Sequence, residues 1–449
     1  MPSEPARDLF TRLLRSSVEA IADEAVKRLA GDPAATPAPP APPTPAASPL
    51  PDPSAPVALH RAFDYDAVLD GLTRFARALD GDAAARAEGG ERAWGELERH
   101  PHARRLLLVR HGKRFHSWGL FDRLVEAAQE IAPDDPLEAC RRSALALEVV
   151  DRLRHPWLSE RHVEDLRAAA LRSLARAQHL RGDRGSLRAA AATADRARAA
   201  LRRGARDPLE LAHLLALRSR LAAEAGQRKE AARLLVSAGR VYQSLGQTEL
   251  EARTLVARAQ LLGHRDPRLG AALLGEALAR LDPRAEPRAA LSARHQLAWF
   301  TNDLGEPRDA RRLMAEIRPL YLRFSDAAVT VHRRWLEGRI LRNLERLDEA
   351  EAMLAAVAGS LAELRVVEDL VLCALDLLEL YGRAERRADL ARLDLAVRGR
   401  LAAWSARGDA TAAWARAVEN AASRPAVREV ALLFREAGWR LIPVTTGYL

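Results

Sequence analysis

Small and apolar side chains recur along the chain with a period of about 40 residues, a length in the range of helical repeats. Four alanines mark the period, each in a helix-like stretch after a short turn: Ala231, Ala271, Ala310 and Ala350. Twelve positions before them stand four more small residues, Ser219, Ala259, Ala298 and Gly338. Seven positions after them stand the apolar Ala238, Leu278, Ile317 and Val357. Such a period predicts stacked helical hairpins that bury their apolar faces only against one another.

The segments around these alanines, "AGQRKEAARLL", "LGEPRDARRLM" and "LERLDEAEAML", resemble the tetratricopeptide repeat (TPR). In that family small residues sit where helix A touches helix B of a hairpin, and "EA" or "DA" opens helix B. The resemblance implies an all-α fold, a right-handed α-solenoid of TPR-like hairpins. The family's usual step is about 34 residues, so the longer step of this chain predicts longer helices. Segments between 97 and 440 also resemble a group of uncharacterised bacterial repeat proteins, which brings no known activity.

The solenoid is expected to cover residues 97–400, with a register that weakens toward both ends. The alanine pattern continues more weakly in both directions. Ala191 lies 40 residues before Ala231, and Ala388 lies 38 residues after Ala350. Residues 401–449 predict two closing helices and a loosely docked tail. The register is therefore firm only between residues 212 and 360.

The sequence of residues 1–56 predicts a helix that a flexible linker joins to the rest of the chain. Residues 1–30 form an amphipathic pattern, and the linker 31–56 contains eleven prolines, which favours an extended, disordered chain. Residues 57–96 predict a helical lead-in with a glycine-rich break at 88–90. Three roles are open for the first helix: it covers a face of the solenoid, docks on another protein, or lies on a membrane surface. Its polar face lacks the cationic excess that the last role needs.

Composition limits the class of protein and its compartment. Arginines outnumber lysines by 67 to 3, a bias that GC-rich coding explains, so the net charge of +9 is weak evidence of a partner. The isolated Cys140 and Cys373 offer no redox pair or metal knuckle. No signal peptide begins the chain, and no apolar run is long enough to span a membrane. These features predict a cytoplasmic protein without a membrane partner.

One segment, "LLLVRHGKR" at 106–114, resembles the opening strand and RHG triad of the histidine phosphatases. There Arg110 and His111 would bind and attack a phosphoryl group. That fold also needs parallel strands that bring a second histidine and an arginine to the same pocket, whereas helical sequence rich in Ala, Leu and Arg follows here. We therefore expect a helix and no enzyme activity, with the phosphatase as a distant alternative.

Four histidines lie close together in the sequence, namely His100, His102, His111 and His116. Their spacings do not form i,i+4 pairs on one helix, and Asp122 is the nearest acid. Zinc sites need ligands that converge in such pairs or through cysteines and carboxylates. The sequence therefore predicts no metal and no cofactor.

Positive charge is concentrated in residues 167–206, where eleven arginines face two aspartates, a net charge of +9. Four of the arginines fall at i,i+4 steps and predict a basic ridge: Arg172, Arg176, Arg198 and Arg202. A solvated outer face is the simplest interpretation, and an acidic protein surface is a second. Nucleic acid is the least expected partner because no nucleic-acid-reading motif is present.

The resemblance also assigns a partner-binding groove. In TPR hairpins the second, fifth, ninth and twelfth residues of helix A face the concave side. This register places there His213, Arg220, Arg253, Gln260, His295, Trp299, Asn302, His332, Trp335, Arg339 and Arg342. Aromatic and arginine side chains often dominate interface energies. The opposite interpretation is that Trp299 and Trp335 pack between hairpins.

These patterns predict a non-enzymatic protein-protein interaction scaffold or adaptor. Its concave groove is expected to hold a peptide, a helix or an acidic segment of a protein partner. The second interpretation is a partner- or ligand-sensing repeat arm of a bacterial signalling or transcription system. A helix-turn-helix signature would favour that arm, and none is evident in the sequence. The oligomeric state is left open.

Overall fold

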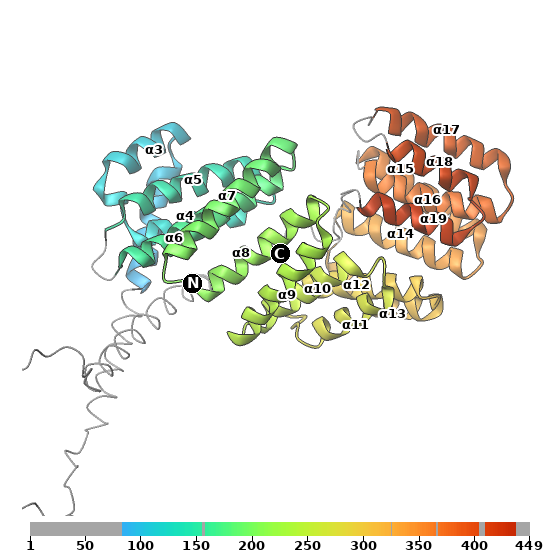
Figure 1. The fold of residues 1–449 in the computed structure, drawn as a ribbon, viewed down its shortest axis with the longest axis horizontal. Coiled ribbons are helices and arrows are strands. Elements are labelled where there is room, and N and C mark those ends of the chain that lie inside the picture. Colours follow the sequence, from blue (N-terminus) through green and yellow to red (C-terminus); the bar gives the residue numbers. More distant parts are fainter. Residues whose placement is uncertain (1–82, 155–157, 325, 365–366, 404–408, 437–449) are drawn as a thin grey trace, which may run out of the picture.

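The chain folds into α-helices joined by short turns (Figure 1). The computed structural model describes residues 83–154, 158–324, 326–364, 367–403 and 409–436, and this part of the chain contains no β-strand. The segments 1–30 and 31–56 and residues 57–82 of the lead-in lie outside the described residues, so the interpretations given for them stay predictions. The predicted all-α fold is confirmed.

A helix over residues 83–98 comes first. The helices that follow in the first part of the chain are α3 (His102–His111), the 3-10 turn η1 (Lys113–Phe115), α4 (Trp118–Ile131), α5 (Pro136–Arg152), α6 (Glu160–Arg181), α7 (Arg184–Arg203), α8 (Pro208–Glu224) and α9 (Arg228–Ser244). The second part contains α10 (Thr248–Leu262), α11 (Pro267–Leu278), α12 (Pro287–Asp303), α13 (Pro307–Arg323), α14 (Ala327–Asn343), α15 (Leu347–Glu363), α16 (Val367–Arg383), α17 (Arg387–Ala403), α18 (Asp409–Glu419) and α19 (Arg424–Glu436).

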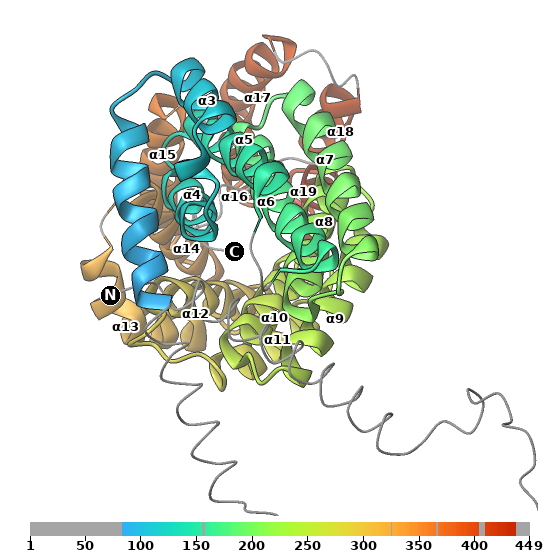
Figure 2. The ribbon, with the colours of Figure 1, turned by 90° about the vertical axis from the view of Figure 1, so that its left-hand side faces the viewer.

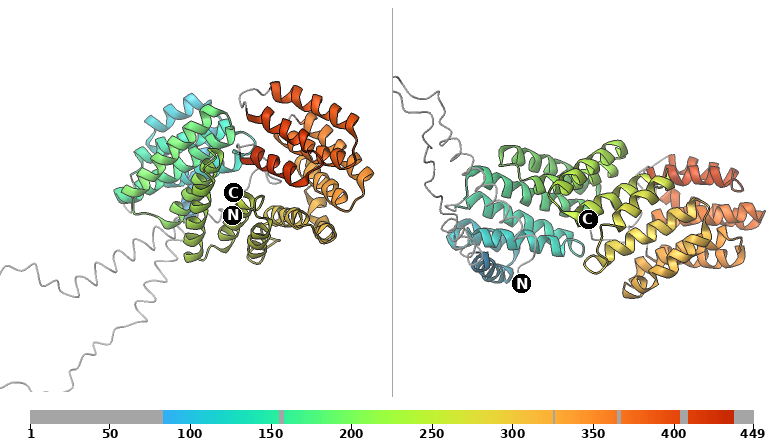
Figure 3. Two further views of the ribbon diagram at one scale, coloured as in Figure 1. Left: turned by 45° about the vertical axis from the view of Figure 1, so that its right-hand side comes forward. Right: turned by 90° about the horizontal axis from the view of Figure 1, so that it is seen from below.

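From α4 onward each even-numbered helix pairs with the next odd-numbered helix in a hairpin. Even-numbered helices also contact the even-numbered helix of the next hairpin, which links α4, α6 and α8 and, farther along, α10, α12, α14 and α16. The helices stand side by side in rows (Figure 3), and the chain winds around a central axis with the even-numbered helices from α4 to α16 toward it (Figure 2). We call the surface of these helices the inner face.

The period of the repeat has a simple geometric origin. Helices α12, α14 and α16 begin at residues 287, 327 and 367, and each is 17 residues long, as are α13, α15 and α17. Two such helices and two short turns make one repeat. The prediction of longer helices than the usual TPR is therefore confirmed. A left-handed residue ends the inner helix at the same place in each repeat: Gly305 (φ 87°), Glu345 (φ 61°) and Glu385 (φ 54°).

Small residues mark the contact within each hairpin. The hydroxyl of Ser219 on α8 donates to the carbonyl of Ala231 on α9 (2.9 Å). A Cβ on Gly338 would come within 2.9 Å of the Leu354 side chain on α15, so a side chain there would displace Leu354. Ala259, Ala298, Ala310 and Ala350 are likewise fully buried.

The two alanines that extend the pattern toward the ends of the solenoid, Ala191 and Ala388, do not lie at such contacts. Ala191 on α7 and Ala388 on α17 are exposed, and on α7 the buried alanines are Ala190, Ala194, Ala197 and Ala200 instead. For α7 the cause is helix length: α6 and α7 have 22 and 20 residues, which shifts the crossing point of this hairpin relative to that of the shorter helices farther along the chain.

The glycine-rich break expected at 88–90 is wrong, because the helix runs without interruption from 83 to 98. Gly90 serves a close contact instead. A Cβ at this position would lie 2.3 Å from the backbone oxygen of Gly119 on α4. Two helices meet there backbone to backbone, and only glycine permits the approach.

Candidate functional site

The eleven residues predicted to line a groove lie on the inner-face helices α8, α10, α12 and α14. Five are half-buried: His213, Arg220, Arg253, Gln260 and Arg339. Six are buried: His295, Trp299, Asn302, His332, Trp335 and Arg342. The expectation of an open aromatic surface is wrong for Trp335, which is 0% exposed. There the structure shows the other interpretation, a tryptophan packed between hairpins.

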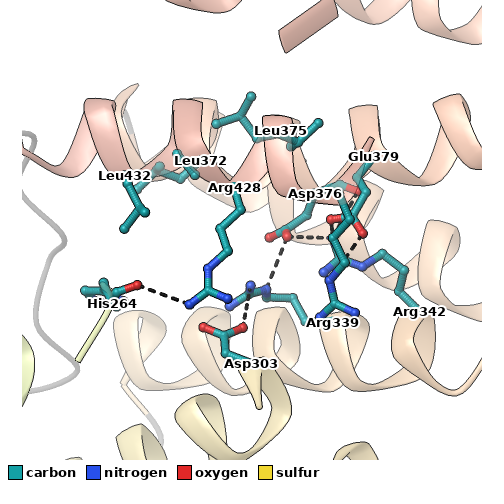
Figure 4. A pocket seen from close by; sticks show the side chains of 13 residues that line it. His264, Asp303, Arg339, Arg342, Leu372, Leu375, Asp376, Glu379, Arg428 and Leu432 are labelled. Carbon is teal, nitrogen blue, oxygen red and sulfur yellow. Dashed lines mark hydrogen bonds and ion pairs between the residues drawn. The ribbon is translucent and has the colours of Figure 1, made fainter. Parts of the chain in front are cut away.

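A buried network of charges links the inner helices α12, α14 and α16 (Figure 4). The carboxylate of Asp376 accepts hydrogen bonds from Trp335 Nε1 (2.7 Å), Arg342 Nη1 (2.7 Å) and Arg339 Nε (3.2 Å). Arg339 Nη2 also donates to Asp303 (2.9 Å), and Arg342 pairs with Glu379 (3.0 Å). Burial acts to raise the pKa of Asp376, but the guanidinium groups of Arg339 and Arg342 hold it below its ordinary value.

The aromatic residues of this region complete the same packed unit. The rings of Trp299 and Trp335 meet edge to face with centroids 5.5 Å apart. The Arg339 guanidinium lies 4.3 Å from the Trp299 ring centroid, within the range of a cation–π contact. The face of the Arg339 guanidinium therefore contacts the Trp299 ring, and its edge donates hydrogen bonds to Asp376 and Asp303. Arg339 thus stabilises the interior of the solenoid.

Two histidine–tyrosine pairs occupy comparable places in two hairpins. In α12 and α13, His295 Nδ1 lies 2.6 Å from the Tyr321 hydroxyl, and in α8 and α9, His213 Nδ1 lies 2.9 Å from the Tyr242 hydroxyl. His295 is buried, whereas His213 is half-buried. Burial, with a smaller effect from the neighbouring His332, lowers the pKa of His295 to about 3.

The inner face of α6, α8 and α10 carries arginines that are less completely paired. Arg172 Nε donates to Glu210 (2.6 Å), and Arg253 pairs with Glu286. Arg220, on α8, forms no hydrogen bond or ion pair with any residue in the described part of the chain.

The groups that act on Arg220 include two more guanidinium groups and no carboxylate. Burial, together with the repulsion of Arg176 and Arg253, lowers the pKa of Arg220 to about 9. A guanidinium keeps its proton at neutral pH. The shift therefore expresses unfavourable electrostatic energy rather than loss of charge. We call Arg176, Arg220 and Arg253 the arginine cluster.

The four arginines of the predicted basic ridge do not form one exposed surface. The side chain of Arg172 is only 13% exposed, because it turns toward Glu210 on α8. Arg176 is half-buried on the same helix. Arg198 and Arg202 are exposed on α7, the outer helix of the hairpin. The i,i+4 steps hold on each helix, but the hairpin separates the two pairs.

The segment that resembles a histidine phosphatase is helical. Arg110 and His111 end α3, and Arg110 pairs with Glu148 on α5 (2.5 Å). The strand that the phosphatase fold requires at this place is thus replaced by a helix. His116 Nε2 lies 2.7 Å from the carbonyl of Val109. In the residues that the structure describes, no group of three or more His, Cys, Asp or Glu is arranged to hold a metal ion.

None of the described helices combines the length and apolar character needed to cross a membrane.

Sequence reasoning missed the acidic partners on α16. Asp369, Asp376 and Glu379 lie in a largely apolar helix, "VEDLVLCALDLLELYGR", and all three are buried. Asp376 stands 34 residues after Arg342 and 41 after Trp335, close to one repeat away. Acids in an apolar helix, one repeat from basic and aromatic residues, are the signal that could have identified the network.

The comparisons with known proteins bear on the fold. The sequence matches no protein-family model and no curated protein. The crystal structure of a Rap protein complexed with Competence and Sporulation Factor is similar, with a TM-score of 0.55 and 11% identity over 71% of this chain and 87% of that chain. Aspartyl phosphate phosphatase F from Bacillus subtilis has a TM-score of 0.47 and 13% identity over 66% of this chain and 70% of that chain. The chain has a TPR-like helical-repeat fold, similar to that of the Rap protein.

Proposed function

We propose that the protein is a non-enzymatic interaction scaffold that binds an acidic segment of a partner protein. The binding surface is the inner face of α6, α8 and α10. One observation carries this proposal: the half-buried Arg220 has no counter-ion in the described chain and is flanked by Arg176 and Arg253. A half-buried cation without a counter-ion is unfavourable, and an anion that reached Arg220 would neutralise it. A carboxylate that accepts hydrogen bonds from guanidinium groups forms the strong, charge-assisted kind.

Two further observations support a protein partner. The similar Rap structure is solved in complex with Competence and Sporulation Factor, so this fold can hold another molecule. In addition, His213 and Gln260 lie half-buried on the same helices as Arg220 and Arg253. We assign these four predicted groove residues to contacts with the partner. The other seven, from His295 to Arg342, belong to α12 and α14, and we assign them to shaping the solenoid from within.

A direct test uses an acetylated, fluorescein-labelled decaglutamate peptide as the probe. Fluorescence anisotropy on the full chain measures its dissociation constant. Arg220→Gln removes the charge and is expected to weaken binding about 10-fold, the effect of losing one charge-assisted contact. The matched control is Arg188→Gln, an exposed arginine on the outer helix α7, which is expected to change binding less than about 2-fold.

Equal losses in both variants would contradict the proposal, because they would show attraction to net charge alone. Circular dichroism of both proteins checks that neither change unfolds the chain.

A further inference from the structure

Two inner helices of the second part, α14 and α16, meet at a buried histidine and a buried aspartate. His332 on α14 is 5% exposed, and Asp369 on α16 is 0% exposed. His332 Nε2 lies 3.4 Å from Asp369 Oδ2. Neither oxygen of the Asp369 carboxylate accepts a hydrogen bond from any other group in the described chain. Asp369 therefore depends on His332 for a proton donor.

The second ring nitrogen of His332 indicates where the protons of this pair lie. His332 Nδ1 is 2.8 Å from the carbonyl oxygen of Ala328, one turn earlier on α14. A carbonyl oxygen only accepts, so Nδ1 carries a hydrogen and donates it. In a neutral imidazole Nε2 would then be an acceptor, and it would face a carboxylate that also only accepts. The contact is therefore favourable only when a further proton lies between Nε2 and Oδ2.

The helix that carries Asp369 favours the charged form of the pair. Asp369 is the third residue of α16, and negative charge is stabilised in the first turn of a helix. The proton therefore belongs to His332, which makes the pair an imidazolium and a carboxylate. On the neighbouring inner helix, His295 is in the opposite state, because burial, with a smaller effect from His332, lowers its pKa to about 3. The histidine with an acidic partner is charged, and the one without is neutral.

The other titratable groups around the pair come from α12, α13, α14 and α16. They are His295, Tyr321, Arg339, Arg342, Cys373 and Asp376. Burial, together with the charges of Asp376 and Asp369, raises the pKa of the Cys373 thiol, which therefore stays protonated. Its Sγ donates to the carbonyl of Leu354 on α15 (3.5 Å). Arg339 and Arg342 form ion pairs with Asp376, so these guanidinium groups do not neutralise Asp369.

We propose that His332 and Asp369 form a pH-sensitive contact, which joins α14 to the start of α16 while it holds one proton and weakens when that proton is lost. Loss of the proton leaves a buried carboxylate beside a second acceptor, without water to solvate either group. Two turns later on α16, Asp376 accepts hydrogen bonds from α14 that need no such proton. The contact is thus the pH-dependent one of two polar connections between these helices.

The direction of the pH effect follows from the unfolded chain. An unfolded histidine titrates near pH 6.5, so below that pH both states carry this proton. Above pH 6.5 the unfolded chain releases the proton while the folded pair keeps it, and stability falls as pH rises. His295 acts in the opposite direction, since its folded form stays neutral below pH 6.5. The combined contribution of the two histidines to stability is therefore greatest near pH 6.5.

Nitrogen NMR of the full chain, labelled at histidine, observes the proton directly. At pH 7.5 a free histidine is mostly neutral. We expect a signal from a histidine with both ring nitrogens protonated, and this signal should be missing from His332→Gln. The matched control is His111→Gln, at an exposed position at the end of α3, which should leave the signal unchanged.

Asp369→Asn separates a proton-dependent contact from an ordinary structural one. The asparagine amide can donate to the neutral Nε2 of His332, so the contact persists without the further proton. We expect the signal of the doubly protonated ring to disappear in this variant. Between pH 7.5 and pH 8.5 the unfolding equilibrium constant, measured by urea denaturation, should rise about 10-fold less than in wild type, the effect of one proton.

Two results would overturn the proposal. The first is a neutral His332 at pH 7.5, seen as identical signals from doubly protonated rings in wild type and His332→Gln. The second is an Asp369→Asn protein with the pH dependence of wild type, which would give the pair a structural role without a proton. Circular dichroism checks that the variants are folded. If His332→Gln is unfolded, the comparison of wild type with Asp369→Asn decides by both measurements.

Discussion

The two parts of the solenoid use arginine for different purposes. On α14, Arg339 and Arg342 are surrounded by the carboxylates of Asp303, Asp376 and Glu379, and α19 covers them. On α8, Arg220 has other guanidinium groups as its charged neighbours. The register predicts the same inner-face role for all of these arginines. Their partners separate them, since a neutralised arginine holds the fold and an unneutralised one is available to a ligand.

The apolar cores of the two parts of the solenoid also differ. From α10 to α19 the buried side chains form one continuous cluster, which includes Trp335, Trp414 and Phe434. From residue 94 to α9 the buried side chains of the described chain fall into several smaller clusters. A continuous core spreads the loss of any one contact over many neighbours. We therefore expect the first part to adjust to a bound segment more readily than the second.

The sharpest test of the contrast is Asp376→Ala. This change leaves Arg339, Arg342 and Trp335 Nε1 without their shared acceptor inside the protein. Breaking a buried ion pair from one side costs about 3–5 kcal/mol, so we expect the free energy of unfolding to fall by that amount. Urea denaturation followed by circular dichroism measures it. A loss below about 1 kcal/mol would mean that the network behaves like a surface salt bridge.

A second test concerns pH and the two histidine–tyrosine pairs. The folded-state pKa of His295 is lowered to about 3, whereas an unfolded histidine titrates near 6.5. Below pH 6.5 the unfolded chain therefore binds a proton that the folded chain does not, and stability falls as pH falls toward 3. At pH 5 the loss from this residue is about 2 kcal/mol relative to pH 7.5.

The matched variants His295→Gln and His213→Gln separate this effect from other titrations. Glutamine does not titrate, so the fall in unfolding free energy between pH 7.5 and pH 5 should be about 2 kcal/mol smaller in His295→Gln than in wild type. His213→Gln leaves His295 in place and should keep the part of the wild-type slope that comes from His295. Identical slopes in the two variants would show that burial does not distinguish the pairs.

The repeat was predictable from sequence because its signals are local. Ser219 and Ala231, or Gly338 and Ala350, lie twelve positions apart across one turn, and a small residue at each place is enough to indicate the crossing of two helices. The prediction failed at Ala191 because the longer helices α6 and α7 move that crossing. A fixed step cannot follow a change in helix length.

The site was only partly predictable, since its chemistry depends on which helix lies opposite. The register placed Trp335 and Arg342 on the inner face, but their burial is set by Asp376 on the next inner helix and by α19, two hairpins farther along the chain. Arg220 was named for the same reason as Arg342, and the sequence alone does not show which of the two meets a carboxylate. Electrostatic pairing across repeats, unlike periodicity, requires the packed structure.

The smallest expected effect is the most direct comparison with Asp376→Ala. Arg220→Leu removes a cation that is repelled by Arg176 and Arg253 and has no hydrogen bond to lose in the described chain. Replacement of an unneutralised, half-buried charge by an apolar side chain should leave the free energy of unfolding unchanged or raise it by up to about 1 kcal/mol. The same urea denaturation measures it. A loss of about 2 kcal/mol or more, the size expected for a broken charge-assisted hydrogen bond, would show that Arg220 supports the fold as Arg342 does. The distinction between the two parts of the inner face would then disappear.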